Sequence, residues 1–361
     1  MCPMNESPSK KRFGQFDYLR GLAIIGIVLG HVTGRLDILG QGNDDIALTN
    51  IGIFDMRLFC IPLFFLVSGT IFFINYNERF DLKRYYTKRV KRMVPPYLLF
   101  SAAYIAAHYL LYNPLTLNEM LFMVATFYAH PHFWFILAIL QFYLIFPLLL
   151  PIAKKQRGMK IELLMLCALL IFQSLMNASS FPLRPTTVLT QSQDSTIWAF
   201  SRLLFFMQYI FWFYLGMIIG KHLNRFEGLL VRQQIPILIC LPVAIIAAAI
   251  MPIYYPLQDS FFVSIIFSAI MLVEIFGIYR FSLILTNRQK VEQVKFLGRE
   301  SFGIYMIHPM VILGIVPLLG IIGLTNLDPI FYPILLIATI AVSIVFVLVI
   351  RRIPNNRILL G

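Results

Sequence analysis

The chain has 361 residues, of which 59% are hydrophobic and only 13% are Asp, Glu, Lys or Arg, and its mean hydropathy is +0.78. Ordinary soluble domains are about half apolar and about a quarter charged, so this composition excludes a water-soluble fold. The net charge of +13 could indicate nucleic-acid binding. However, the cations follow the ends of apolar runs and do not form one patch, so we expect no nucleic-acid partner.

The amino-terminal residues 1–14 are polar and basic. They lack the apolar core of a signal peptide, so we expect a short cytoplasmic segment and no cleaved leader. Apolar runs of about 17 to 25 residues then recur, each long enough to cross a hydrocarbon core of roughly 30 Å. We therefore predict one membrane domain over residues 15–351 and a short cytoplasmic tail over residues 352–361.

The predicted fold class is all-α: a polytopic transmembrane helical bundle of about ten helices, with both termini in the cytoplasm. The ten predicted spans are Leu22–Leu36, Arg57–Tyr76, Pro95–Tyr112, His132–Ala153, Ile161–Asn177, Arg202–His222, Ile235–Met251, Phe261–Arg280, Phe302–Leu324 and Ile330–Ile350.

The distribution of basic residues supports this topology. With these spans, 26 of the 30 Lys and Arg residues fall in alternate connecting segments, and only Arg35, Arg57, Arg184 and Arg202 fall on the other side. Cytoplasmic loops carry such an excess of positive charge. One span more or fewer would move every later segment to the opposite side, so the pattern favours ten.

Two stretches on the outer side do not fit a simple span. Leu117–Tyr128 is apolar but too short to cross, and we interpret it as a re-entrant or interfacial helix. The loop Ala178–Ser201 is rich in Ser, Thr, Pro and Gln, which is typical of a polar rim and not of a second folded domain.

The four cysteines do not predict a metal site or a disulfide framework. Cys2, Cys60, Cys167 and Cys240 are scattered singly, without a CxxC pair. We expect no metal and no permanently bound cofactor.

Ionisable residues inside spans are costly and therefore candidates for function. His31 follows Arg20 by eleven residues, which corresponds to roughly 16 Å along a helix axis. Arg20 would mark the cytoplasmic boundary and His31 would lie past the middle of the membrane. From the residues alone, His31 is either an interhelical hydrogen-bonding residue or a general base or nucleophile.

A second candidate is the basic segment that precedes the third predicted span. It contains six Lys and Arg residues between Lys83 and Arg92. Such clusters often only fix topology or contact anionic lipid headgroups. Arg89 and Arg92, however, are three residues apart and share a helical face, and paired guanidinium groups suit bidentate phosphate binding.

Several of these motifs resemble the membrane-bound acyltransferase-3 family. They occur in the order Phe16-Asp17-Tyr18-Leu19-Arg20-Gly21-Leu22-Ala23 followed by His31, Pro62-Leu63-Phe64-Phe65-Leu66-Val67-Ser68-Gly69, Arg89-Val90-Lys91-Arg92 followed by Pro95-Pro96-Tyr97, His132-Phe133-Trp134-Phe135 with Gln141-Phe142-Tyr143, and Phe296-Leu297-Gly298-Arg299-Glu300-Ser301-Phe302-Gly303-Ile304-Tyr305-Met306-Ile307-His308-Pro309. Each motif alone is weak, but their order from residue 16 to residue 309 is specific.

The resemblance implies transfer of an acyl group, commonly acetyl from acetyl-CoA as co-substrate, onto hydroxyls of extracytoplasmic carbohydrate. It implies that Arg20, Arg89 and Arg92 bind the acyl-CoA and that His31 is catalytic. Some relatives carry an extracytoplasmic esterase-like domain, which is absent from this sequence. We therefore expect transfer within the membrane domain or with a separate extracytoplasmic partner protein, in the cell (cytoplasmic) membrane.

Accessory roles are open for four further residues. His308 could orient a thioester or be structural beside Tyr305, and Glu274 lies in an apolar run, where it must find a partner or be protonated. Trp134 could stack on a sugar or belong to an interfacial aromatic belt, and Arg35 lies at a predicted span edge. Two other functions remain as alternatives, an exporter of a polysaccharide or lipid-linked sugar and a non-enzymatic membrane scaffold.

Overall fold

The computed structural model describes residues 13–33, 59–111, 114–177, 204–254, 260–286, 291–325 and 328–353. All regular structure in these ranges is helical. The elements in chain order are α1 (Gly14–Thr33), α3 (Cys60–Tyr76), α4 (Leu82–Leu111), α5 (Leu117–Ala125), η3 (Pro131–Phe133), α6 (Trp134–Lys154), α7 (Met159–Asn177), η4 (Phe205–Tyr209), α10 (Ile210–Lys221), α11 (Leu223–Arg232), α12 (Gln234–Tyr254), α13 (Phe261–Leu285), α14 (Glu292–Ile321) and α15 (Phe331–Arg351).

Seven described helices are long and apolar enough to cross a membrane: α1, α4, α6, α7, α13, α14 and α15. The consecutive helices α11 and α12 raise this number to eight if they form one span, although they are bent by 81° relative to each other. Two further apolar helices are shorter, α3 and the segment Phe205–Lys221. The structure thus confirms a multi-span, all-helical membrane protein, while the count of ten and the orientation of the termini stay predictions.

Three helices begin well before the predicted spans, by eight residues or more. The helix α1 begins at Gly14, α4 at Leu82 and α14 at Glu292, because a charged segment that cannot enter hydrocarbon can still be helical outside it. In α4, Pro95 and Pro96 lie inside the helix and not at its start. Their rings carry no N–H to donate to the preceding turn, but membrane helices accommodate such prolines.

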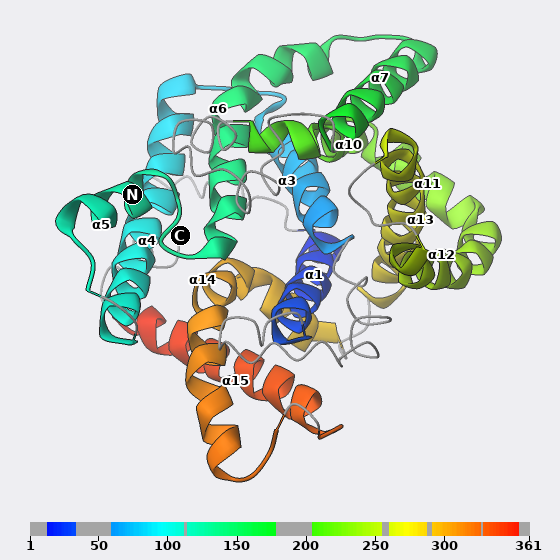
Figure 1. The fold of residues 1–361 in the computed structure, drawn as a ribbon. Coiled ribbons are helices and arrows are strands. Elements are labelled where there is room, and N and C mark those ends of the chain that lie inside the picture. The colour runs from blue at the N-terminus through cyan, green and yellow to red at the C-terminus, as the bar shows by residue number, and fades with distance from the viewer. Residues whose placement is uncertain are drawn as a thin grey trace, which may run out of the picture.

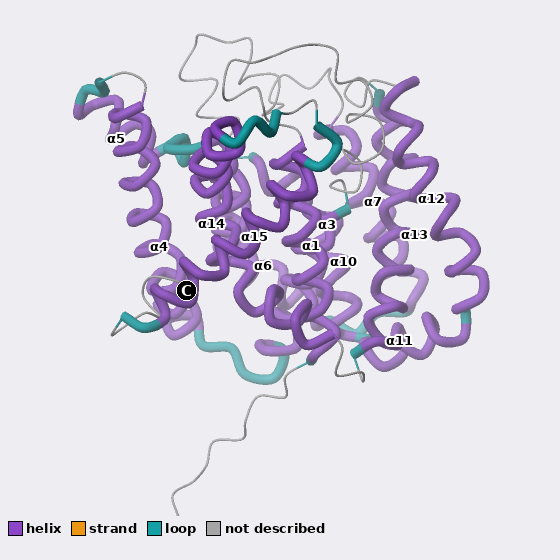
Figure 2. Tube along the Cα trace, turned by 90° about the horizontal axis from the view of Figure 1, so that it is seen from below, coloured by secondary structure: helices purple, strands orange, loops and turns teal. Residues whose placement is uncertain are grey.

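The short helix α5 lies within the stretch Leu117–Tyr128, for which the sequence predicts a re-entrant or interfacial helix. Its N-terminus carries a capping box in which Thr116 and Glu119 bond each other's backbone N–H groups. Hydrogen bonds from the Thr116 backbone and hydroxyl lower the pKa of the Glu119 carboxyl. Leu117 and Leu121 are exposed, and α5 lies at the end of the bundle opposite α11 (Figure 2).

The helix α1 lies inside the bundle and packs most extensively against α14, with further contacts to α3, α13 and α15 (Figure 1). Two glycines allow the close approach of α1 and α14. A Cβ atom on Gly21 would lie 2.0 Å from the carbonyl oxygen of Val294, and one on Gly298 would lie 1.7 Å from that of Asp17. Small residues of this kind let membrane helices pack backbone to backbone.

Paired glycines also allow the close approach of α3 and α10, the pair of described helices with the most extensive contact. Cβ atoms on Gly69 and Gly216 would each lie 2.0 Å from a backbone oxygen of the other helix. The outward faces of the peripheral helices are apolar, with Leu164, Ile239 and Ile337 each about two-thirds exposed or more. Exposed apolar surface of this extent fits a lipid environment and not water.

Candidate active site

A cavity of about 260 Å³ lies where α1, α3, α4, α6 and α14 meet. Five cationic side chains line it, namely Arg20, Lys88, Arg89, Arg92 and Arg299. No Asp or Glu is among its lining residues within the described part of the chain. A concentration of positive charge in a partly enclosed space attracts anions, so the cavity is suited to an anionic ligand.

The three predicted donor-binding residues meet in this cavity. Arg20 projects from α1, and Arg89 and Arg92 project from the N-terminal half of α4. Arg20 experiences the positive charges of Arg92 and Arg89, which oppose the negative charge of Asp17. Like charges held this close repel each other unless a counter-ion is present, and a bound anion would relieve that repulsion.

Arg89 is held rigidly by aromatic residues. Its side chain is buried and its Nη2 atom donates a hydrogen bond of 3.2 Å to the Tyr76 hydroxyl. Its guanidinium carbon lies 4.2 Å from the ring centroid of Phe72 and 4.9 Å from that of Tyr143. Cation–π contacts of this geometry stabilise a partly desolvated guanidinium by about 0.5–2 kcal/mol, so the charge is positioned before any ligand arrives.

Sequence reasoning did not select two of the five cations. Lys88 belongs to the basic segment and would have been found by taking the residues four before Arg92 on the same helical face. Arg299 lies within a quoted motif, and its Nη1 atom is 3.6 Å from Glu292 Oε2. Only the packing of α14 against α1 brings Arg299 into the same cavity as Arg20, and periodicity within one helix does not reveal that.

The lining of the cavity changes from cationic to apolar along α14. Gly298, Ser301 and Tyr305 line it, and they recur at intervals of three and four residues, which places them on one helical face. Phe64 and Phe135 contribute apolar walls near Tyr305. The cavity therefore leads from a cationic end to an apolar end at Tyr305.

Four histidines gather beside Tyr305. Its ring centroid lies 5.7 Å from that of His308 and 5.2 Å from that of His132. His31 of α1 lies with its ring centroid 5.0 Å from that of His308. The Nδ1 atoms of His130 and His132 are 2.6 Å apart, so one of them carries the proton that they share.

The environment of His308 fixes its tautomer. Its Nδ1 atom lies 3.1 Å from the carbonyl oxygen of Ile304 and 2.9 Å from that of Tyr305. Carbonyl oxygens only accept hydrogen bonds, so in the neutral ring Nδ1 carries the hydrogen and Nε2 carries the lone pair. That Nε2 atom is buried and has no hydrogen-bond partner among the described residues.

His31 is not one of the residues that line the cavity, and it approaches the site through the histidine cluster. It lies eleven residues after Arg20, and at about 100° per residue the two side chains share one face of α1. Arg20 thus marks the cationic end of the site and His31 the histidine end. Across the described residues, no group of three or more His, Cys, Asp or Glu is arranged to hold a metal ion.

Two of the remaining candidates do not line the cavity. Glu274 is buried on α13 and is not a cavity residue. The ring of Trp134 stacks on Phe205 and Tyr209, with centroids 5.6 and 5.7 Å away. Arg35 lies outside the described residues.

The structure is an all-helical membrane bundle with a cationic cavity that reaches Tyr305, whose ring lies beside those of His308 and His132. Comparison with known proteins identifies it further. The chain belongs to the acyltransferase-3 family, described as an acyltransferase domain, which matches residues 13–348. The protein is therefore a multi-pass membrane acyltransferase, and the group that it transfers is not an aminoacyl group.

Curated relatives are distant. Two proteins from Staphylococcus aureus strains Mu50 and MRSA252, each named a probable poly-beta-1,6-N-acetyl-D-glucosamine export protein, are 24% identical over 304 residues, which cover 82% of this chain and 81% of theirs. An uncharacterised protein from Haemophilus influenzae is 29% identical over 148 residues, which cover 35% of this chain and 60% of its own. No solved structure matches.

Proposed function

We propose that the protein is an O-acyltransferase that moves an acyl group, acetyl from acetyl-CoA, onto a hydroxyl of an extracytoplasmic or envelope polysaccharide or glycolipid. One observation carries the proposal: a cavity with five cations at one end reaches Tyr305, whose ring lies against the rings of His308 and His132. The enzyme would act in the cell membrane with the cationic end at the cytoplasmic face.

The phosphates and the pantetheine arm of acyl-CoA match the cationic end and the apolar end of the cavity. Its phosphates would bind Arg20, Arg89 and Arg92, since guanidinium groups pair well with phosphate oxygens. The uncharged pantetheine arm would pass along the apolar wall toward Tyr305. The phosphates would then remain at the membrane surface, and no multiple charge would have to cross hydrocarbon.

His31 would supply the proton acceptor that acylation of a hydroxyl requires. In the proposed step, His31 takes the hydroxyl proton while the hydroxyl oxygen attacks the thioester carbonyl carbon. The carbon–sulfur bond then breaks, and the proton passes from His31 to the departing thiolate, which leaves as CoA-SH. In a two-step route, the acyl group would first pass to His31, with release of CoA-SH, and then to the hydroxyl oxygen. The products would be the same.

His308 would position His31. Because its Nδ1 hydrogen is directed to backbone carbonyls, its Nε2 lone pair would accept a hydrogen bond from the N–H of His31. That bond would leave the other nitrogen of His31 unprotonated and ready to act as the base, as the orienting partner of a catalytic histidine does in other enzymes. The acceptor glycan would approach from the opposite side, alone or held by a separate extracytoplasmic partner protein.

The donor assignment is tested with purified protein in lipid nanodiscs and acetyl-CoA. Arg89→Ala/Arg92→Ala should bind acetyl-CoA at least tenfold more weakly, because each lost charge-assisted contact contributes about 1.5–3 kcal/mol. Lys160→Ala/Arg232→Ala is the matched control, since it removes two exposed cations that do not line the cavity. Equal affinity in both double variants would mean that the basic segment only fixes the topology and does not bind the donor.

A second function, polysaccharide export, is suggested by the printed name of the Staphylococcus aureus relatives. Mass spectrometry of envelope glycans separates it from acyl transfer. An acyltransferase whose His31 is replaced should leave the glycan at the cell surface without its acyl groups. An exporter would instead lose surface glycan, while the acyl content of the remaining glycan stays unchanged.

A further inference from the structure

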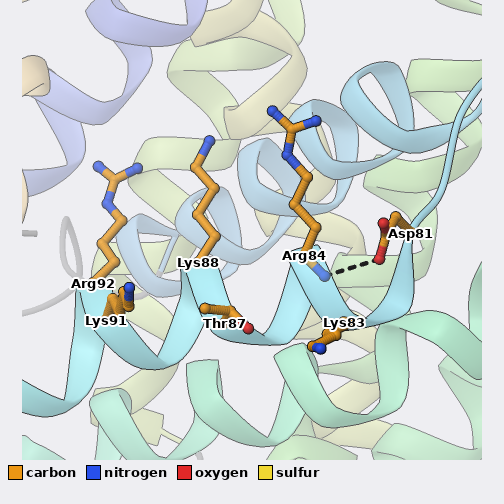
Figure 3. A pocket seen from close by; sticks show the side chains of 7 residues that line it. All are labelled: Asp81, Lys83, Arg84, Thr87, Lys88, Lys91 and Arg92. Atoms are coloured by element: carbon orange, nitrogen blue, oxygen red, sulfur yellow. Dashed lines mark hydrogen bonds between the residues drawn. The ribbon is translucent and has the colours of Figure 1, made fainter.

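A second depression, of about 800 Å³, lies beside the cavity on the N-terminal part of α4 (Figure 3). It is open to the surface, whereas the first cavity is partly enclosed. Its seven lining residues are Asp81, Lys83, Arg84, Thr87, Lys88, Lys91 and Arg92. Five of these seven side chains are cationic, and all five are exposed.

The acidic residue of the depression does not balance this charge. The Asp81 carboxylate accepts a hydrogen bond of 2.9 Å from the backbone N–H of Arg84, and so it helps to begin the helix. Arg84, Lys88 and Arg92 are spaced by four residues, which aligns them along one face of α4. In Figure 3 their three side chains extend to the same side of the helix.

The depression and the cavity share two lining residues. Lys88 and Arg92 line both of them, so a ligand held by these two side chains can extend from one space into the other. Lys83, Arg84 and Lys91 line only the depression.

The volume of the cavity limits how much of an acyl-CoA molecule it can hold. Pockets for drug-sized ligands have volumes of about 300–1,000 Å³, and an acyl-CoA is larger than most drugs. The 260 Å³ cavity can therefore enclose only a part of it. The remainder must lie in a space that adjoins the cavity at its cationic end, which is where the depression lies.

We propose that this depression is a second phosphate subsite, and that it binds the 3′-phosphate on the ribose of the acyl-CoA through Lys83 and Arg84. The inference rests on the proposed function, because it takes acyl-CoA as the donor. Arg20, Arg89 and Arg92 bind the pyrophosphate at the mouth of the cavity. The 3′-phosphate, at the other end of the nucleotide, then reaches the cations that line only the depression.

An anionic lipid headgroup presents the same phosphate chemistry to exposed cations at a membrane surface. The shared lining residues Lys88 and Arg92 favour the nucleotide, because a single ligand can then contact both spaces. The two sources are separated by comparing acetyl-CoA with dephospho-acetyl-CoA, which lacks only the 3′-phosphate. Each ligand is titrated in nanodiscs of neutral lipid and in nanodiscs that contain anionic lipid.

The variant is Lys83→Gln/Arg84→Gln, and Lys160→Gln/Arg232→Gln is the control that removes the same two charges at exposed positions elsewhere. In neutral nanodiscs the first variant should bind acetyl-CoA about three- to tenfold more weakly, as expected for two exposed ion contacts. Its affinity for dephospho-acetyl-CoA should stay that of the wild type. The control should bind both ligands as the wild type does.

Other outcomes overturn the inference in distinguishable ways. An equal loss for both ligands would mean a general attraction of anions, and no loss would mean that the depression does not contact the donor. A loss confined to anionic nanodiscs would assign the depression to lipid. If wild-type protein binds neither ligand, the donor assignment fails and the subsite fails with it.

Discussion

The imidazole rings of His31 and His308 lie with their centroids 5.0 Å apart and inclined by 47°, although one belongs to the first described helix and the other to the last but one. The two rings lie side by side, and the Nε2 atom of His308 has no hydrogen-bond partner among the described residues. His308 is fully buried, and the backbone carbonyls that accept its Nδ1 hydrogen fix its orientation. His31, by contrast, is only half-buried.

Replacement of His31 should abolish glycan acylation. His31→Ala removes the proposed base, and His31→Gln keeps the size and hydrogen bonding of the side chain but cannot take a proton comparably. General bases contribute about 10²–10⁴ in rate, so both variants should lose activity to that extent. The measurement is acetyl transfer from isotopically labelled acetyl-CoA to glycan, followed by mass spectrometry.

A control on donor binding makes that result specific. Both variants should insert into the membrane and bind acetyl-CoA like the wild type, because His31 is not a cavity residue. If His31→Gln keeps most of the acylation activity, His31 is structural and its catalytic assignment is wrong.

Replacement of His308 distinguishes a positioning role from a packing role. Gln can place its side-chain oxygen near the position of the histidine Nε2 atom and accept a hydrogen bond there, whereas the shorter Asn cannot. We therefore expect His308→Gln to retain more activity than His308→Asn, with the loss in kcat and little change in the KM for acetyl-CoA. Equal losses in both variants, or a loss confined to KM, would contradict the role of the Nε2 lone pair.

Much of this fold could be predicted from the sequence because hydrocarbon imposes simple rules. Length and apolar composition indicate membrane helices directly. The spacing of Arg20 and His31 places them on one helical face without any tertiary information. The helix starts were missed because hydropathy detects the hydrocarbon-crossing part of a helix and not its charged extension, as at Leu82 in α4.

Periodicity within single helices does not predict which helices pack against each other. Arg299 lines the same cavity as Arg20, and the ring of His308 lies beside that of His31, because α14 packs backbone to backbone against α1 at Gly21 and Gly298. The glycines are visible in the sequence, but their pairing across the chain is not. Of the site residues that sequence analysis left without a role, Arg299 and Tyr305 lie on α14, Lys88 lies beside a selected residue on α4, and His130 and His132 lie at η3.

The topology of the connecting segments can be tested by cysteine labelling after the four native cysteines are replaced. The distribution of basic residues predicts that Lys88 and Lys155 face the cytoplasm and that positions 113 and 192, which lie outside the described residues, face the exterior. Single cysteines at these positions should react with an impermeant maleimide from opposite sides. Labelling of positions 155 and 192 from the same side would contradict the ten-span topology.

The close contact of α1 with α14 predicts unequal effects of two Gly→Ala substitutions in α14. In Gly298→Ala the new methyl group would lie 1.7 Å from the carbonyl oxygen of Asp17, so one backbone must move. Overpacking of this kind typically costs about 1–3 kcal/mol. In Gly314→Ala nothing lies within 4 Å of the new atom, and the substitution should be neutral or stabilising by about 0.5–1 kcal/mol, as expected for alanine in a helix.

Thermal unfolding of both variants in the same detergent measures this difference, and acetyl-CoA binding measures its consequence for the site. Gly298, Arg20 and Arg299 line the same cavity, so a shift of α14 away from α1 would move Arg299 relative to Arg20. Gly298→Ala should therefore lower both the unfolding temperature and the affinity for acetyl-CoA, whereas Gly314→Ala should lower neither. If Gly298→Ala unfolds and binds like the wild type, the two backbones do not approach this closely, and the placement of Arg299 in the same cavity as Arg20 loses its structural basis.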